Sequence, residues 1–287
     1  MLSYTFDVDY ELIFIDDGSK DNTLNSIKEL ADYDDFVKYI SFSRNFGKES
    51  ALFAGLKNST GDYVVVMDAD LQDPPNLLPE MFRLILTEDY DCIATRRVSR
   101  KGEPKLRSFF ARLFYKFINH ISDLEFVDGA RDYRLMTRQV VDSILELNEY
   151  HRFSKGIFNW VGFKTKWIEY ENVKRVDDET SWSFWSLFKY SIEGIVAFST
   201  LPLSLSTFFG IVFSILAFVL ILIVTIKKLL YGNAVQGWTS IICAVLLLGG
   251  IQLFSIGILG KYLDKTYMES KKRPIYLKRE SNIENDE

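Results

Sequence analysis

The sequence predicts an α/β fold, with a mainly parallel sheet flanked by helices, followed by a C-terminal hairpin of two transmembrane helices. Two observations support this fold class. Short apolar runs rich in β-branched residues alternate with helical patterns over the first part of the chain, and two long apolar runs without charged side chains follow residue 193. Strand–helix alternation at this spacing is typical of a parallel sheet covered by helices on both faces.

The composition fits a folded protein and excludes several classes of function. Of the 287 residues, 48% are hydrophobic, which is enough for a substantial core and excludes extended disorder, apart from the polar tail after Lys278. The net charge of −5 argues against a protein that coats nucleic acid. Cys92 and Cys243 lie far apart, and His120 and His151 are the only histidines, which argues against a disulfide framework and a zinc site.

The strands and helices of the first domain are expected to follow one another in order. Apolar runs predict strands at residues 11–16, 37–42, 63–67 and 91–95. The patterns between these runs predict helices at residues 22–33, 47–58 and 76–87. Ligands of such sheets bind at the carboxyl ends of the strands. The polar residues that follow each strand are therefore the first candidates for site residues.

Two apolar runs near the C-terminus predict the membrane hairpin. Residues 201–226 and 238–260 each reach the roughly 20 apolar residues that a helix needs to span a bilayer. The alternative, a buried helix of a globular core, seldom stays uncharged for this length. Residues 231–237 form the short connecting turn.

Basic residues predict the orientation of this hairpin. The connecting side carries only Lys227 and Lys228. The segment after the second run carries Lys261, Lys265, Lys271, Lys272, Arg273, Lys278 and Arg279. Because basic residues mark the cytoplasmic side, we expect a multi-pass protein of the cytoplasmic (inner) membrane with both termini in the cytoplasm.

The chain therefore divides into four expected segments. They are a cytoplasmic α/β domain at residues 1–170, an amphipathic juxtamembrane segment at 171–200, two transmembrane helices at 201–260, and a basic, then polar, cytoplasmic tail at 261–287.

Two adjacent carboxylates, Asp16 and Asp17, follow the first predicted strand. Gly18 gives this segment an ordinary turn signal, and Asn22 or Thr23 can cap the next helix. One interpretation is therefore a simple strand-to-helix turn. The other is a binding role, because neighbouring carboxylates repel each other unless a ligand or a donor neutralises them, and they can accept hydrogen bonds from a nucleobase or ribose.

A second pair, Asp68 and Asp70, follows the third predicted strand and precedes Pro74 and Pro75. Similar Asp-x-Asp spacings occur elsewhere in the chain by chance, but only this pair follows a buried strand. Residues i and i+2 of an extended segment point the same way, so both carboxylates can converge on one cation. With diphosphate oxygens they suit Mg²⁺ or Mn²⁺. The alternative is a solvated acidic loop.

Two aromatic-rich stretches predict contact with a membrane surface. Basic and aromatic residues interleave over residues 100–117, and aromatic residues recur over residues 182–190, just before the first apolar run. Amphipathic helices of this composition lie in an anionic interface. The alternative is that these aromatic residues belong to an ordinary core.

Three segments together carry a resemblance to a known family. They are IDDGSKDNT at residues 15–23, FSRNFGKE at 42–49 and DADLQDPP at 68–75, with further matches in DYRLM at 132–136 and RFSKG at 152–156. The chain resembles the polyprenyl-phosphate glycosyltransferases of the inverting GT-A family-2 type, which include bactoprenol glucosyltransferases and dolichol-phosphate mannose synthases. The similarity covers nearly the whole chain and implies a GT-A-like domain over residues 1–170.

The resemblance also implies roles for individual residues. These are donor binding by Asp16, Asp17, Arg44 and Arg96, metal and diphosphate binding by Asp68, Asp70 and Gln72, and the reaction centre with its phosphate contacts at Asp132, Arg134 and Arg107. A lipid monophosphate is already largely anionic near neutral pH. The site then needs cations that hold two anions in line more than it needs a strong base. Whether Asp132 takes a proton or orients other groups is left open.

The expected function is that of a metal-dependent inverting glycosyltransferase. By resemblance, it moves a hexose, glucose or N-acetylglucosamine, from a nucleotide donor, best guessed as a uridine diphosphate sugar, to polyprenyl (undecaprenyl) phosphate for modification of cell-envelope glycans. A homo-oligomer is expected, and nucleic acid is not a partner. The motifs do not select the sugar.

Three other functions are alternatives to this one. Members of the family begin with a further strand ahead of the position matching Met1, which leaves open an N-terminally shortened, non-catalytic membrane adaptor. A processive polysaccharide synthase would carry a Gln-x-x-Arg-Trp motif and more membrane spans. A dinucleotide-binding oxidoreductase would carry Gly-x-Gly-x-x-Gly after a strand, and the sequence has neither motif.

Overall fold

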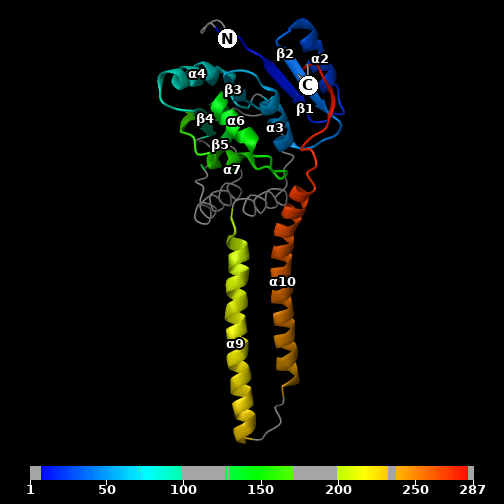
Figure 1. The fold of residues 1–287 in the computed structure, drawn as a ribbon, viewed down its shortest axis with the longest axis vertical. Coiled ribbons are helices and arrows are strands. Elements are labelled where there is room, and N and C mark those ends of the chain that lie inside the picture. Colours follow the sequence, from blue (N-terminus) through cyan, green and yellow to red (C-terminus); the bar gives the residue numbers. More distant parts are fainter. Residues whose placement is uncertain are drawn as a thin grey trace. The chain divides into compact units, whose positions relative to one another are not determined.

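The computed structural model describes residues 8–70, 72–97, 127, 129–170, 199–231 and 237–283. The chain divides into two compact units, one of Met1–Gly194 with Lys272–Glu287 and one of Ile195–Lys271 (Figure 1).

The first unit contains strands and helices close to those expected from the sequence. In order, the elements are β1 (Leu12–Asp16), α2 (Thr23–Tyr33), β2 (Val37–Phe42), α3 (Lys48–Asn58), β3 (Tyr63–Val66), the short 3₁₀ helix η1 (Pro75–Leu77), α4 (Leu78–Thr87), β4 (Cys92–Arg97), β5 (Ala130–Thr137), α6 (Arg138–Glu146), α7 (Ser154–Trp160), β6 (Thr165–Tyr170) and β7 (Lys278–Ser281). Through β4, each predicted strand and helix is confirmed to within two residues of its ends.

The strands form two mixed sheets, so the prediction of a mainly parallel sheet is wrong. Their orders are β1–β2–β7 and β3–β5–β4–β6. Within them, β1 with β2 and β4 with β6 are parallel, whereas β2 with β7, β3 with β5 and β4 with β5 are antiparallel. The main cause is β5, which lies between β3 and β4 and runs against both. Its sequence, ARDYRLMT, is too rich in charge to read as an apolar strand.

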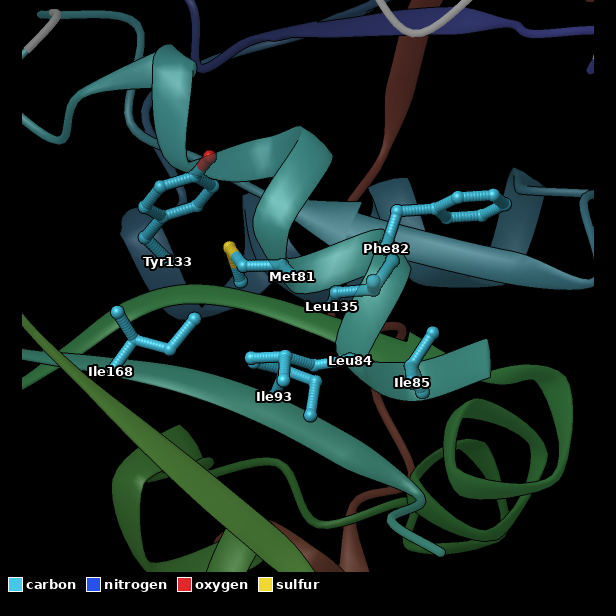
Figure 2. Packing of buried hydrophobic residues seen from close by; sticks show 8 residues of the cluster. All are labelled: Met81, Phe82, Leu84, Ile85, Ile93, Tyr133, Leu135 and Ile168. Atoms are coloured by element: carbon cyan, nitrogen blue, oxygen red, sulfur yellow. The ribbon is translucent and has the colours of Figure 1, made fainter. Parts of the chain in front are cut away.

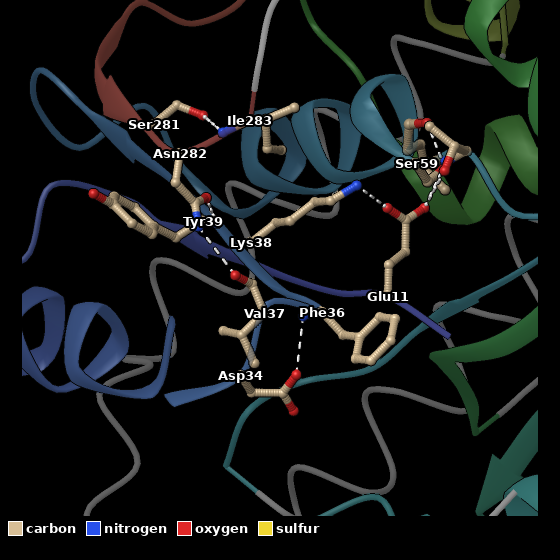
Figure 3. Close-up of polar contacts among 12 residues, drawn as sticks. Glu11, Asp34, Phe36, Val37, Lys38, Tyr39, Ser59, Ser281, Asn282 and Ile283 are labelled. Carbon is tan, nitrogen blue, oxygen red and sulfur yellow. Dashed lines mark hydrogen bonds and ion pairs between the residues drawn. The ribbon is translucent and has the colours of Figure 1, made fainter. Parts of the chain in front are cut away.

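The tail is ordered from Lys278 to Ile283, contrary to the expectation of disorder in this polar segment. Strand β7 pairs with β2, and just beyond it the Asn282 side chain accepts a hydrogen bond from the Tyr39 N–H (2.6 Å) and donates one to the Val37 carbonyl (3.0 Å) (Figure 3). Polar side chains are compatible with an edge strand, because one of its sides faces solvent.

Helix α4 packs its apolar side on the second sheet. Figure 2 shows the resulting cluster of buried residues: Met81, Phe82, Leu84, Ile85, Ile93, Tyr133, Leu135 and Ile168. The last four come from β4, β5 and β6. This packing fixes β5 at the centre of its sheet, and with it the candidate site residues that β5 carries.

The second unit consists of two long helices. They are α9 (Leu201–Tyr231) and α10 (Trp238–Ser270), which contact each other. The Tyr262 hydroxyl donates to the Ser199 carbonyl (2.7 Å). In the part of the chain that the structure describes, one segment, Leu201–Lys227, is long and apolar enough to cross a membrane, by length and composition. The second span remains a prediction, and most of the connecting turn lies outside the described residues.

Candidate functional site

The carboxylate of Asp16, at the end of β1, is enclosed by hydrogen-bond donors of the protein. The side chain is buried, and it accepts hydrogen bonds from the Ser19 N–H (3.0 Å) and the Ser41 hydroxyl (2.7 Å). Burial raises the pKa of Asp16, but the hydrogen bonds from Ser19 and Ser41 outweigh it, so the pKa is lowered overall. Asp16 is thus a stably ionised group that holds the β1–α2 turn against β2.

Asp17 fastens a different loop to the same strand end. Its carboxylate accepts hydrogen bonds from the N–H groups of Phe46 (2.6 Å) and Gly47 (2.9 Å), ahead of α3. The turn after β1 and the loop before α3 lie very close together. A Cβ on Gly18, whose φ is +71°, would lie 2.6 Å from the carbonyl carbon of Arg44. The Arg44 guanidinium lies over the Phe46 ring, 4.0 Å from its centroid. The donors that neutralise the Asp16–Asp17 pair therefore come from the protein itself.

Lys48, the first residue of α3, joins two of the predicted site residues. Its Nζ lies 2.8 Å from Oδ2 of Asp68, just beyond β3, and 2.7 Å from Oδ2 of Asp132 in β5. Burial raises the pKa of Asp132, but the positive charges of Lys48 and Lys155 outweigh it and lower the pKa overall. Lys48 had no predicted role, although it lies within FSRNFGKE. Its chain position alone gives no sign that it meets these two carboxylates.

The loop after Asp68 is held by Arg131, a second residue without a predicted role. Asp70 accepts a hydrogen bond from the Gln72 N–H (3.1 Å), and the Gln72 side-chain oxygen accepts one from Arg131 (3.3 Å). Arg131 also donates to the fully buried Asp73 (2.9 Å), which accepts a further bond from the Tyr170 hydroxyl. Burial lowers the pKa of Arg131, but the charge of Asp73 outweighs this and raises it.

Arg134 lies in the interior. Its guanidinium is 3.6 Å from the centroid of the Phe158 ring, donates to the Arg131 carbonyl (3.1 Å), and belongs to a side chain only 3% exposed. Burial lowers its pKa. Tyr133 between Asp132 and Arg134 points to the opposite face of β5, into the core of Figure 2, where burial raises its pKa to about 12.

Glu49 ties α3 to α7 beside this group. Its carboxylate accepts hydrogen bonds from the N–H (2.8 Å) and the hydroxyl of Ser154. Burial raises the pKa of Glu49, and the negative charge of Asp132 acts in the same direction, against the hydrogen bonds from Ser154. The segments FSRNFGKE and RFSKG, far apart in sequence, are thereby brought into direct contact.

Of the remaining predicted residues, only Arg96 lies within the described part of the chain, and its partner is outside this group. Arg96, near the end of β4, pairs with Glu169 of β6. Arg107 lies outside the described residues, as do the stretches 100–117 and 182–190 that were expected to contact the membrane.

The chemistry of the donor set fits a hard divalent cation. Asp68 is partly exposed and Asp70 is exposed, so both can offer carboxylate oxygens to an incoming ion. Within the described ranges, no three His, Cys, Asp or Glu side chains are grouped to hold a metal ion. A protein cage of that kind is not required, because Mg²⁺ is typically held by one or two carboxylates together with water and substrate phosphates.

Comparison with known proteins gives the relationships of the chain. The model for "Glycosyl transferase family 2" matches residues 5–145. The chain is 48% identical over 277 residues to "Putative glycosyltransferase CsbB" of Bacillus subtilis (strain 168), covering 96% of this chain and 84% of that protein. It is 42% identical over 267 residues to "Prophage bactoprenol glucosyl transferase homolog" of Escherichia coli (strain K12), covering 93% and 87%. It is 41% identical to "Bactoprenol glucosyl transferase" of Shigella phage SfX, with the same coverage.

Proposed function

Because the chain belongs to glycosyl transferase family 2, we propose that it transfers a hexose from a nucleotide donor to a polyprenyl phosphate. Relatives named bactoprenol glucosyl transferase support the lipid acceptor and favour glucose as the sugar. The observation that carries the proposal is the meeting of Asp68, Lys48 and Asp132 from three separate elements. We infer a uridine diphosphate donor, inversion at the anomeric carbon, and a product used in cell-envelope glycans.

The charges of the site suit a reaction between two anions. The acceptor phosphate carries between one and two negative charges at neutral pH, so its oxygen attacks without a strong base. The lowered pKa of Asp132, which burial opposes and Lys48 and Lys155 cause, makes this carboxylate a weak base. We therefore assign Asp132 a positioning role toward Lys48 and the sugar. Arg134 supports it from the interior, and Arg107 remains an expected contact of the phosphates.

Asp68 and Asp70 would hold a Mg²⁺ or Mn²⁺ beside the donor diphosphate. When bound, such an ion neutralises the charge that develops on the leaving diphosphate. Gln72 then acts through Arg131, because its side-chain oxygen already accepts a hydrogen bond from that residue. Asp16, Asp17 and Arg44 would shape the nucleoside side of the site. Arg96, which pairs with Glu169 in the structure, would have to exchange that partner to contact phosphate.

We propose an inner-membrane location with both termini in the cytoplasm. The Leu201–Lys227 segment is apolar enough to cross a bilayer, and its apolar side chains are largely exposed in the structure. The residues from Lys272 onward belong to the same compact unit as those up to Gly194. A chain that leaves a unit, crosses a bilayer once and returns to that unit must cross back, which supports α10 as the second span. Self-association through these helices is part of the proposal.

The first test replaces Asp70 by Asn. Full-length protein in detergent is given labelled uridine diphosphate glucose, polyprenyl phosphate and Mn²⁺, and label is counted in the organic phase. We expect Asp70→Asn to lose roughly 100-fold or more in rate, because charge stabilisation by a metal contributes several kcal/mol. Asp35→Asn, an exposed carboxylate between α2 and β2, is the matched control and should transfer at the wild-type rate. Equal rates for all three proteins would refute the metal assignment, and no transfer by the wild type would favour the adaptor.

A further inference from the structure

The ammonium group of Lys48 lies between two carboxylates with separate predicted roles, Asp68 in metal binding and Asp132 at the reaction centre. It is 2.8 Å from Asp68 and 2.7 Å from Asp132. The Lys48 side chain is half exposed, whereas that of Asp132 is 14% exposed. Lys48 thus reaches from the solvent side of the site toward a nearly buried carboxylate.

The sheet register explains why a cation is needed there. Strands β3 and β5 are antiparallel, with Val66 opposite Arg134. Asp68 follows Val66 by two residues and Asp132 precedes Arg134 by two, so both carboxylates lie just past this end of the β3–β5 pairing, where Lys48 contacts each of them. Two carboxylates that share one ammonium group repel each other, and Lys48 cancels part of this repulsion.

In the same geometry, Lys48 competes with any second cation for the Asp68 carboxylate. An ammonium 2.8 Å from Asp68 occupies part of the coordination space of that carboxylate and repels a divalent ion that approaches it. Lysine has a flexible four-carbon stem, so its ammonium can move without a change in the backbone. The partly buried Asp132 can keep its bond to Lys48 while the more exposed Asp68 gives its bond up.

We propose that Lys48 is a built-in competitor of the divalent cation at Asp68, and that it couples metal binding to donor binding. Without a divalent cation, Lys48 pairs with Asp68 and Asp132 at once and offsets part of their combined negative charge. When Asp68 binds a divalent cation, the Lys48 ammonium is released toward an anionic phosphate of the donor. The new contact with phosphate replaces the lost ion pair between Lys48 and Asp68. Metal alone therefore binds weakly, and metal with a nucleoside diphosphate binds well. The inference rests on the proposed function, because it takes the cation to be the one that accompanies the donor.

The test measures Mn²⁺ binding and needs no turnover. Free Mn²⁺ is followed by electron paramagnetic resonance in full-length wild type, Lys48→Gln and Lys48→Met, with and without uridine diphosphate. Removing the charge of Lys48 should tighten Mn²⁺ binding without nucleotide on the order of tenfold, which is within the usual range of coupling between two sites. Uridine diphosphate should then improve Mn²⁺ binding less in the variants than in the wild type.

Two controls separate charge from folding. Lys57→Met removes an exposed lysine from the last turn of α3 and should bind Mn²⁺ as the wild type does. Lys48→Arg keeps the positive charge and should keep the weak affinity. Glutamine can still donate hydrogen bonds to both carboxylates, so Lys48→Gln serves if Lys48→Met fails to fold.

Unchanged or weaker Mn²⁺ binding by Lys48→Gln would overturn the inference, as would the absence of Mn²⁺ binding to every variant at millimolar concentration. If the wild type transfers hexose while the Mn²⁺ affinities stay equal, the inference fails and the proposed function stands. If the affinities change as expected but no hexose is transferred, the proposed function fails alone.

Discussion

Asp16 and Asp17 illustrate how neighbouring carboxylates are kept at the end of an apolar strand. Asp16 accepts hydrogen bonds from Ser19 and Ser41, while Asp17 accepts them from the backbone N–H groups of the loop before α3. Each carboxylate thus has its own donors, and the charge is stabilised before any ligand arrives. These contacts hold two loops at the end of β1, where the donor nucleoside is proposed to bind.

We predict that Asp16→Asn destabilises the protein by about 1–3 kcal/mol at pH 7, because the hydrogen bonds from Ser19 and Ser41 would lose their charged acceptor. The folded-state pKa of Asp16 is lowered from 3.8 by the bonds from Ser19 and Ser41, which outweigh burial. The stabilisation is therefore present above pH 3.8 and is lost as the pH falls through the lower folded value. Thermal denaturation of detergent-solubilised protein from pH 7 to pH 3 should show the gap to wild type narrowing. A gap that stays constant with pH, or an equal loss in Asp35→Asn, would contradict this account.

At the residue scale, the sequence predicts the carboxylates of the site better than its cations. Asp68 could be found because it follows an apolar strand, and Asp132 because it lies in a motif of a known family. Lys48 and Arg131 could not, because their roles arise from contacts across the fold. Arg134 was expected at the reaction centre, yet its guanidinium is stabilised against the Phe158 ring in the interior.

At the element scale, β5 and β7 could not be predicted from apolar patterns, because their sequences contain many charged side chains. In β5, Arg131 is neutralised by the buried Asp73, and Arg134 packs on an aromatic ring, so a strand with three charges is stable inside a sheet. Strand β7 is also tied to helix α2 by the ion pair of Lys28 with Glu280 (2.6 Å). The earlier strands and helices could be predicted because apolar periodicity marks each of them.

The segment before β7 should contribute measurably to stability. Tyr276 stacks on Phe42 with ring centroids 4.8 Å apart, and its hydroxyl accepts a hydrogen bond from Asn58 (3.3 Å). We expect Tyr276→Ala to cost about 2–4 kcal/mol, which is typical of removing a packed aromatic side chain. The measurement is thermal denaturation of the purified protein.

Tyr33→Ala is the control for this variant, because Tyr33 is 92% exposed and its loss should change stability by less than about 0.5 kcal/mol. Equal stability of Tyr276→Ala and wild type would mean that the C-terminal tail is not an integral part of the first unit.

At the scale of the whole molecule, the chain builds one unit, leaves it for two long helices and returns to complete it with β7. The α/β unit carries mixed sheets, which agrees with the GT-A-like fold implied by the resemblance, and the charged residues of its site suit two anionic substrates. The apolar helix α9 offers a way to keep that unit beside a membrane, where a polyprenyl phosphate is found.

The most direct test of the central claim is the mass of the lipid product. Purified full-length protein is incubated with uridine diphosphate glucose, polyprenyl phosphate and Mg²⁺, and the extracted lipid is analysed by mass spectrometry. The account predicts a new species heavier than the acceptor by one anhydrohexose, absent when either substrate is omitted. An unchanged acceptor, recovered from protein that is folded and binds the nucleotide sugar, would contradict it.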